Sequence, residues 1–149
     1  MDTPSYLAKT LVNYSTQNGE QTWYKDWAKV IPANEQGEYL VKDVGEWLWK
    51  RFIADGLKNY SVLERAYVTA FLAQGFDFGY IVDQTDPDIT YTIEQLMAEP
   101  LASQISANEN ATMGLNSDDS TTRIQANRRV GLAINFISMT PFTFAVEGK

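Results

Sequence analysis

The chain contains neither cysteine nor histidine. It can therefore form no disulfide, no zinc site with thiolate or imidazole ligands, no histidine-ligated haem and no Cys or Ser–His nucleophile. Long apolar runs are missing as well, because the longest, Val130 to Met139, is interrupted by Asn135 and Ser138. A membrane-spanning helix needs roughly 20 apolar residues, so no span is predicted. Stability must come from packing, and any acid–base chemistry must come from carboxylates.

Cations are absent from the middle of the chain. Between Ala66 and Thr122, here called the acidic stretch, there is no lysine, arginine or histidine. The two ends of the chain hold ten acids against 12 bases, a balance of +2, so the net charge of −7 comes from the acidic stretch. Such a block repels anions, argues against nucleic-acid binding, and favours metal cations or a basic protein surface. Its nine carboxylates are those of Asp77, Asp83, Asp86, Asp88, Glu94, Glu99, Glu109, Asp118 and Asp119.

What is present indicates a globular protein. Hydrophobic residues make up 44% of the 149 residues and aromatic residues 13%, which predicts one helical domain over residues 1–149. The N-terminus has neither the basic segment nor the apolar segment of a secretion signal. The seven lysines are few beside the many Asn, Gln, Ser and Thr residues, which favours an extracytoplasmic or secreted location over the cytoplasmic alternative.

Helix signals recur along the chain and predict an all-α fold, a single compact domain of five or six helices. Two capping boxes mark helix starts, Ser61 with Glu64 and Thr92 with Gln95, because each pair of side chains satisfies free backbone N–H groups. Residues 76–82 fit either a short strand or a buried irregular segment. Apolar spacing with glycine or proline stops predicts helices at residues 4–18, 22–30, 44–55, 61–75, from 92 to a break at 100, and 121–139.

The last two segments are predicted to differ. Residues 103–120 are rich in Asn, Ser and Asp and low in apolar residues, which predicts a long, mobile polar loop. Residues 130–139 are apolar on nearly every side, which predicts a central, buried C-terminal helix. Arg128 and Arg129 point about 100° apart on this helix, so at most one of them can face the core. A structural ion pair is expected at this point.

Three aspartates, Asp83, Asp86 and Asp88, lie in a turn around Pro87. They are the predicted contacts for a basic partner. They are also candidate calcium ligands, because calcium prefers several oxygen ligands on a short loop. Their spacing, D-x-x-D-x-D, lacks the central glycine and the glutamate at position 12 of an EF-hand loop. The alternative is a solvated turn in which the aspartates accept bonds from nearby backbone amides.

Asp77 is the candidate catalytic carboxylate. Phe76, Phe78 and Tyr80 flank it, and apolar surroundings would raise its pKa and hold it protonated, ready to donate a proton. A glycosidase-type mechanism needs a second acid about 5–10 Å away, and none is recognisable from the sequence. The alternative is an aspartate that points to water or caps a helix. An enzyme is therefore less favoured than a binding module.

Trp47 is the candidate aromatic contact. On a helix, Leu48, Trp49, Phe52 and Ile53 share one apolar arc, and Trp47 falls outside it. An exposed indole there would form a platform for a sugar ring or a partner chain. The alternative is that Trp47 covers the loop predicted at residues 33–41.

The segment from Asn127 to Phe142 resembles the closing helix of large uncharacterised secreted bacterial proteins. Those proteins often end in an arginine-led apolar helix and a Ser-Pro-Glu-Phe-like turn. Here Arg128 and Arg129 lead the helix, and the turn is Thr140-Pro141-Phe142, without the glutamate. The resemblance carries no catalytic residues and implies an extracytoplasmic location.

These observations lead to a hypothesis of a non-catalytic, acidic helical module that binds or scaffolds a protein partner, as a domain of a larger secreted bacterial protein. Its acidic face, from Asp77 to Asp119, would meet a basic surface, with Trp47 as an aromatic contact. One alternative is a small carboxylate-dependent hydrolase that acts on a glycan. A second is a calcium-stabilised domain, and only this alternative needs a cofactor, Ca²⁺.

Overall fold

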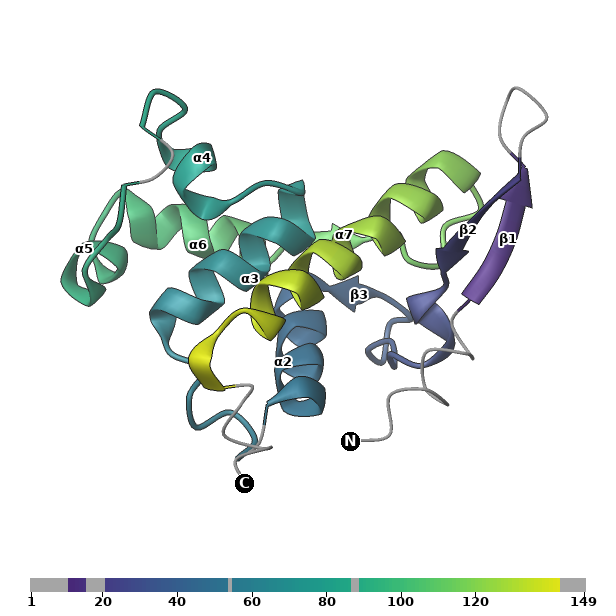
Figure 1. The fold of residues 1–149 in the computed structure, drawn as a ribbon, viewed down its shortest axis with the longest axis horizontal. Helices are drawn as coiled ribbons and strands as arrows, with labels where there is room; N and C mark the ends of the chain where they lie inside the picture. Colours follow the sequence, from purple (N-terminus) through teal and green to yellow (C-terminus); the bar gives the residue numbers. More distant parts are fainter. Residues whose placement is uncertain (1–10, 16–20, 54, 87–88, 143–149) are drawn as a thin grey trace.

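The computed structural model describes residues 11–15, 21–53, 55–86 and 89–142. In that part of the chain the predicted helical class is confirmed, because most of the residues lie in helices (Figure 1). The α-helices are α2 (Val41–Phe52), α3 (Val62–Gln74), α4 (Phe78–Val82), α5 (Ile93–Met97), α6 (Leu101–Glu109) and α7 (Ser120–Ser138). The other elements are a 3-10 helix, η1 (Trp27–Lys29), and the strands β1 (Leu11–Ser15), β2 (Gln21–Lys25), β3 (Tyr39–Leu40) and β4 (Thr112–Met113).

Helix α3 occupies the centre of the molecule. It begins at the predicted capping box of Ser61 and Glu64 and ends at Gly75, whose φ of +78° is the left-handed conformation that glycine adopts easily. It contacts α2, α4, α5, α6, α7 and β4. In Figure 1, α2 lies on one side of it, α4 lies on the other, and α7 crosses it. Every other part of the helical domain is therefore positioned relative to α3.

Two separate clusters of buried apolar residues lie against α3. The large core faces Val68 and Leu72 of α3, and the small core faces Ala66 and Ala70. The rest of the small core consists of Phe78 from α4, Leu96 from α5 and Ile105 from α6. The rest of the large core consists of Trp27, Ile31, Tyr39, Val41, Val44, Leu48, Trp49, Ile53, Met113, Leu115, Ala126, Val130, Ala133 and Ile137.

A buried asparagine joins three segments of the large core. The side-chain oxygen of Asn127, on α7, accepts a hydrogen bond from the backbone amide of Trp27 at 2.6 Å. Its side-chain nitrogen donates to the carbonyl oxygens of Leu115 (3.1 Å) and Arg123 (2.8 Å). Trp27 is buried here, with 1% of its surface exposed. Asn127 thus connects η1 and the β4–α7 loop to the C-terminal helix.

Arg129, rather than Arg128, is the arginine of α7 that turns inward. Its Nε donates to the carbonyl oxygen of Leu72 at 2.9 Å, and its side chain packs beside Gly75 at the end of α3. Burial lowers the pKa of the Arg129 guanidinium. The donated bond satisfies one of the carbonyls that a helix leaves without an intrahelical partner at its C-terminus. Arg129 therefore stabilises α3 through a backbone carbonyl.

The two helices predicted at residues 4–18 and 22–30 are wrong where the structure describes them. Residues 11–15 and 21–25 form the antiparallel strands β1 and β2, with Leu11 opposite Lys25, and only η1 follows. Both strands are rich in β-branched and aromatic residues, which favour a pleated sheet. The Asn18-Gly19 pair between them, interpreted as a helix stop, is also the dipeptide most typical of a hairpin.

The predicted polar loop at residues 103–120 is also wrong. Residues 101–109 form α6, and β4 follows, pairing Met113 with Tyr39 of β3. This segment has few apolar side chains, but three of them, Ile105, Met113 and Leu115, are buried and hold it against the rest of the fold. Polar residues take part too, since the Nε2 of Gln74 donates to the buried Asn108 Oδ1 at 2.8 Å.

Helices α2, α5 and α7 begin close to the positions predicted. The long C-terminal helix α7 is buried along the side that includes Ile124, Val130 and Ile137. Its second half also has a solvent side, on which Leu132 is exposed. None of the described helices combines the length and the apolar character needed to cross a lipid bilayer.

Candidate binding surface on the small core

Asp77 is the N-cap of the short helix α4. Its Oδ1 accepts a hydrogen bond from the amide of Gly79 at 2.8 Å, and the residue is exposed. The flanking Phe76 and Tyr80 are exposed as well and contact each other with tilted rings whose centres lie 5.2 Å apart. The prediction that aromatic side chains enclose Asp77 is therefore wrong. Capping is the local reason for an aspartate at this position, because its side chain satisfies a free amide at the helix start.

The turn after α4 is organised by Asp83. Its Oδ1 accepts hydrogen bonds from the amide (3.0 Å) and the hydroxyl (2.6 Å) of Thr85, and these bonds, the hydroxyl first, lower the Asp83 pKa. Asp86 is exposed on the same turn, and Asp88 lies outside the described residues. Within the described ranges, no three acidic side chains are grouped so that they could hold a metal ion. Calcium binding at this turn stays a prediction.

Trp47 lies apart from these aspartates. It is half-buried on α2 and packs at the edge of the large core. The Cζ atom of Arg51 lies 4.9 Å from the centre of its ring, which is a cation–π contact. In Figure 1, α2 and the α4–α5 region lie on opposite sides of α3. Trp47 thus belongs to a different helix from the turn of Asp83 and Asp86, and the roles of these residues as partner contacts stay predictions.

The acidic stretch is divided between two ends of the molecule. Asp119 caps α7, because its Oδ2 accepts a hydrogen bond from the amide of Thr122 at 3.0 Å, and Asp118 precedes it. This end of α7 lies toward β1 and β2, whereas α4 and α5 lie at the opposite end (Figure 1). A single acidic face from Asp77 to Asp119 is therefore wrong. The acids on the described part of the α4–α5 end are Asp77, Asp83, Asp86, Glu94 and Glu99.

Exposed apolar side chains gather at the same end. The described residues include eight large hydrophobic side chains that are exposed, and five of them lie between residues 76 and 97. Single exposed apolar residues are ordinary on a protein surface, but a concentration of them indicates a contact site. We call this set, together with the five acids, the α4–α5 surface; its apolar members are Phe76, Tyr80, Ile89, Ile93 and Met97.

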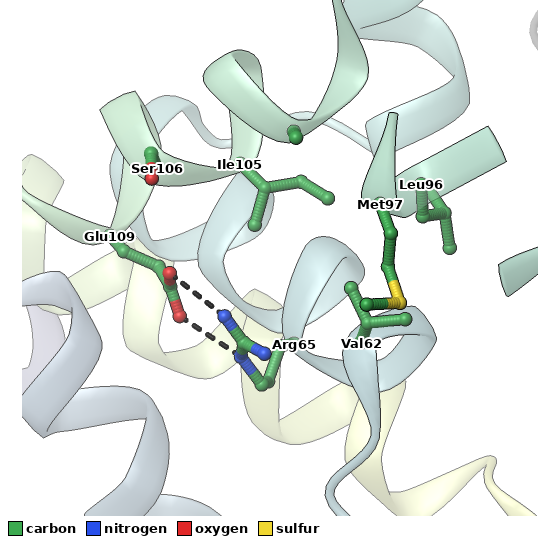
Figure 2. Close-up of a pocket in the computed structure, with 8 residues that line it drawn as sticks. Val62, Arg65, Leu96, Met97, Ile105, Ser106 and Glu109 are labelled. Atoms are coloured by element: carbon green, nitrogen blue, oxygen red, sulfur yellow. Dashed lines mark hydrogen bonds and ion pairs between the residues drawn. The ribbon is translucent and has the colours of Figure 1, made fainter. Parts of the chain in front are cut away.

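A cleft of about 240 Å³ adjoins this surface, between α3, α5 and α6 (Figure 2). Met97 belongs to both, because it is 68% exposed and also lines the cleft. One wall is apolar, and the other carries Arg65 and Glu109 (Figure 2). The residues that line the cleft are Val62, Arg65, Leu96, Met97, Ala102, Ile105, Ser106 and Glu109.

Arg65 and Glu109 form a two-pronged ion pair. Nε of Arg65 donates to Oε2 of Glu109 at 3.1 Å, and Nη2 donates to Oε1 at 3.0 Å. The arginine side chain is 38% exposed and the glutamate 12%, so water screens the pair on the arginine side. The hydrogen bond to Glu109 raises the Arg65 pKa, which keeps the guanidinium charged. The fork geometry fixes the orientation of the guanidinium plane.

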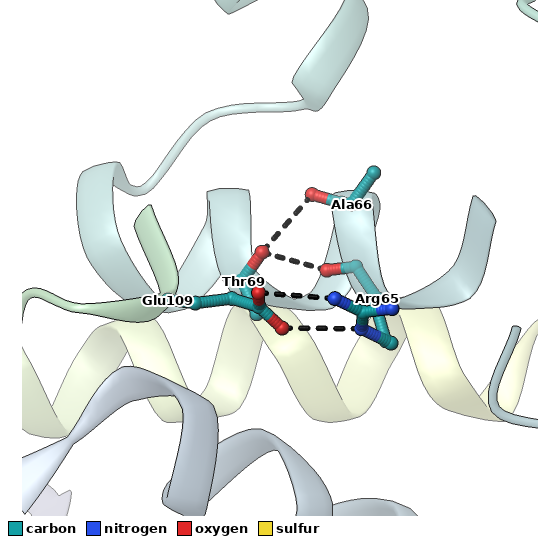
Figure 3. A network of polar contacts seen from close by, with 4 residues as sticks. All are labelled: Arg65, Ala66, Thr69 and Glu109. Carbon is teal, nitrogen blue, oxygen red and sulfur yellow. Dashed lines mark hydrogen bonds and ion pairs between the residues drawn. The ribbon is translucent and has the colours of Figure 1, made fainter. Parts of the chain in front are cut away.

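Two neighbours support this pair from within the fold. Thr69 Oγ1 donates to the carbonyl oxygen of Arg65 at 2.6 Å, one turn back on α3, and lies 3.4 Å from that of Ala66 (Figure 3). The hydroxyl oxygen of the half-buried Tyr60 is itself buried, and burial followed by the charge of Glu109 raises the Tyr60 pKa. The pair is therefore held on a helix whose own backbone is well satisfied.

No local pattern in the sequence marks the pairing of Arg65 with Glu109 or the exposure of Ile93 and Met97. Glu109 follows Arg65 by 44 positions, so no local spacing indicates their pairing. The one available signal is that Arg65 is the last cation before the acidic stretch. The pairing also neutralises one of the nine carboxylates of the acidic stretch.

A comparison with protein families, with curated proteins and with solved structures finds no match for this chain.

Proposed function

We propose that this protein is a non-catalytic binding module that takes a basic, amphipathic segment of another protein on the α4–α5 surface. One observation carries the proposal, which is that the exposed apolar side chains and the acids occur together on one stretch of the chain, residues 76–99, that contains no lysine or arginine. Apolar contact supplies binding free energy, and the acids supply steering and partner choice. A segment with lysine or arginine on one side and apolar residues on the other fits both features.

The shape of the α4–α5 surface favours a short segment of a partner protein, rather than a broad protein face, as the bound group. Helices α4 and α5 have five residues each, and they are joined by a polar connection instead of a sheet or a long helix. Short elements give a narrow contact area, and recognition of an amphipathic helix needs only a few apolar anchors one turn apart. Ile93 and Met97, four residues apart on α5, lie on one side of that helix and can contact two such anchors of a bound segment.

The first test is selection of peptides from a displayed random library on the immobilised full-length chain. Enriched peptides are expected to carry net positive charge, with apolar residues three or four positions apart. Their affinity should fall as NaCl is raised, because exposed charges are screened at higher ionic strength. Enrichment of neutral or acidic peptides would contradict the proposal.

Charge-reversed variants locate the site on the surface. Asp86→Lys with Glu94→Lys should weaken binding of the selected peptides by about tenfold or more, since two attractive charges become repulsive. Glu35→Lys with Glu38→Lys is the matched control, because it changes the net charge equally on an exposed loop outside the α4–α5 surface. Equal losses in the two double variants would show that only the overall charge matters and would overturn the proposed site.

Apolar variants test the second half of the recognition. Ile93→Ser with Met97→Ser removes two exposed side chains of the α4–α5 surface, and Leu132→Ser with Met139→Ser removes two exposed side chains of α7 or its C-cap. Peptide binding should be lost only in the first pair. Thermal unfolding of both pairs checks that the fold is retained.

A further inference from the structure

The cleft beside the α4–α5 surface has a chemistry of its own. Its apolar wall includes Val62, Met97 and Ile105, and its volume of about 240 Å³ lies below the ~300–1,000 Å³ typical of small-molecule sites. It is open to solvent along the side where the exposed Met97 lies. A cleft of this size and lining fits one apolar side chain of a longer chain better than a whole cofactor.

Arg65 supplies hydrogen-bond donors at the edge of this cleft. A guanidinium has five N–H groups, and Glu109 accepts one from Nε and one from Nη2. The third nitrogen, Nη1, faces away from Glu109, on the side of the cleft where Val62 and Met97 lie (Figure 2). The remaining N–H groups have no acceptor among the described residues. They are oriented by the ion pair and available to a bound group.

The charge around Arg65 decides which acceptor suits it. Glu109 already balances the arginine charge, and the surrounding acidic stretch adds further negative charge. A carboxylate or phosphate would meet this field unfavourably, whereas a neutral carbonyl oxygen accepts the same hydrogen bond without charge repulsion. The free donors therefore match a peptide carbonyl.

We infer that the cleft receives one apolar side chain of the bound segment, while Arg65 donates a hydrogen bond to a backbone carbonyl beside that side chain. This inference rests on the proposed function, because it places an anchor of the basic segment next to the α4–α5 surface. Met97 adapts its side chain to the entering group, as unbranched thioethers do. The ion pair to Glu109 positions Arg65 for the carbonyl.

Small probes test the cleft without any partner. The full chain is labelled with ¹³C in its methionine and isoleucine methyl groups. It is then titrated with three probes: N-acetyl-leucine methylamide, which is neutral; N-acetyl-leucine, which carries a carboxylate; and N-acetyl-glycine methylamide, which lacks the apolar side chain. The neutral leucine amide should shift the Met97 and Ile105 methyl signals, the carboxylate should bind more weakly, and the glycine amide should leave them unchanged. The exposed Met139 methyl is the internal control for non-specific contact. Tighter binding of the carboxylate would overturn the inference.

Two variants separate the hydrogen bond from the apolar pocket. Arg65→Met with Glu109→Gln removes the donors without leaving a glutamate charge unpaired, and should weaken the leucine amide by about three- to tenfold, the usual consequence of one lost hydrogen bond. Ala102→Leu fills the cleft and leaves the ion pair in place, so it should abolish the shifts. Unchanged binding in a folded Ala102→Leu protein would contradict the inference.

The outcomes for this inference and for the proposed function can be told apart. If selected basic peptides bind Ala102→Leu as tightly as the original chain, the anchor in the cleft is wrong while the α4–α5 surface stands. If the leucine amide binds in the cleft but library selection yields no basic peptides, the cleft stands and the proposed function is wrong.

Discussion

The large core and the small core share helix α3 as a wall, but they are built on different scales. The large core joins two long helices, α2 and α7, to both strands of the β3–β4 ladder and encloses two indoles, Trp27 and Trp49. The small core has one buried ring, Phe78, and two of its helices, α4 and α5, have only five residues. Regions with few buried contacts open at lower free energy than the rest of a protein. We therefore regard the large core as the scaffold and the small core as the more adaptable, ligand-facing part.

The exposed apolar side chains and the cleft are also distributed unequally between the two cores. The concentration of exposed apolar side chains lies over the small core, and so does the cleft at Arg65. Binding surfaces are commonly drawn from the less stable end of a structure, since they must adapt to a partner. The difference between the cores is thus a physical basis for the site proposed here, and it can be measured directly.

The largest expected effect comes from removing a leucine in each core. Leu48 on α2 and Leu96 on α5 are both fully buried. Leu48→Ala should lower the global free energy of unfolding by about 2–5 kcal/mol, because a cavity remains between long helices that cannot close it. Leu96→Ala should cost less globally, because a five-residue helix can relax or open locally.

Urea unfolding and native-state hydrogen exchange measure these two outcomes. In the Leu96→Ala protein, the amides of α4 and α5 should exchange faster while those of α2 and α7 keep their protection. Equal global losses, with uniform changes in exchange, would show that the two cores unfold as one cooperative unit.

The second comparison uses one buried asparagine on each side of α3. Asn127→Ala should cost about 1–3 kcal/mol for each buried backbone group left without its partner, above all the Trp27 amide and the Leu115 carbonyl. Asn108→Ala should cost less, because its side-chain nitrogen is already buried without a partner in the described part of the chain. Chemical denaturation of the two single variants gives both values, and a costlier Asn108→Ala would reverse the expected order.

A smaller effect is expected where α2 meets α3. A Cβ atom on Gly45 would lie 2.7 Å from the Tyr60 hydroxyl oxygen and 3.3 Å from Val68 Cγ1, whereas a Cβ on Gly131 of α7 would meet nothing within 4 Å. Gly131→Ala should stabilise the protein by roughly 0.5–1 kcal/mol through helix propensity. Gly45→Ala should destabilise it, because overpacking costs about 1–3 kcal/mol and exceeds that gain.

A double variant identifies the cause of the Gly45 penalty. The Tyr60 hydroxyl has no hydrogen-bond partner among the described residues, so Tyr60→Phe removes the clash without breaking a bond. Thermal melts should show that Gly45→Ala costs less in the Tyr60→Phe background than in the original chain. A penalty that is unchanged by Tyr60→Phe would place the strain elsewhere.

The smallest effect concerns acid pH. Asp119 and Asp83 each accept bonds from a threonine hydroxyl and amide, and these bonds lower both pKa values below the ordinary 3.8. Because the folded pKa is the lower one, each carboxylate contributes stability above pH ~4 that is lost as the pH falls through the folded value. Protonation of Asp119 should weaken the cap of α7 in the large core, whereas protonation of Asp83 should affect only the turn after α4.

NMR titration of the Thr122 and Thr85 amides measures both pKa values. Thermal midpoints between pH 2 and 6 should lose part of their acid dependence in Asp119→Asn, and a smaller part in Asp83→Asn, because each substitution removes a carboxylate with a lowered pKa. A titration midpoint at or above 3.8 for either carboxyl would contradict the hydrogen-bonding explanation.

Local patterns predicted the helices whose signals lie close together in the chain. The capping boxes at Ser61 and Thr92 each need a partner only three residues away, and Gly75 needs only its own backbone freedom. Residues 11–15 were assigned to a helix from apolar spacing within the segment, whereas the structure pairs them with residues 21–25. Propensity alone does not decide such segments, because strand pairing is a non-local interaction.

The candidate site shows the same limit. Asp83 was placed on an exposed turn from its sequence, and the structure agrees. Asp77 and Trp47 were singled out for their neighbours in the chain, whereas their environments depend on which helices pack near them. Arg65 and Glu109 gave no local signal, because their ion pair depends on α6 lying against α3.

By itself, the amino-acid sequence determined that this protein is mainly helical, that it uses no thiol or imidazole chemistry, and that a long middle stretch is free of cations. Those properties are sums over composition or depend on partners a few residues apart. The tertiary structure alone decided that the acidic stretch divides between two ends, that Arg65 meets Glu109, and that exposed apolar side chains gather over the small core. The reason is that each of these depends on contacts between segments far apart in the chain, which exist only after the helices have packed on α3.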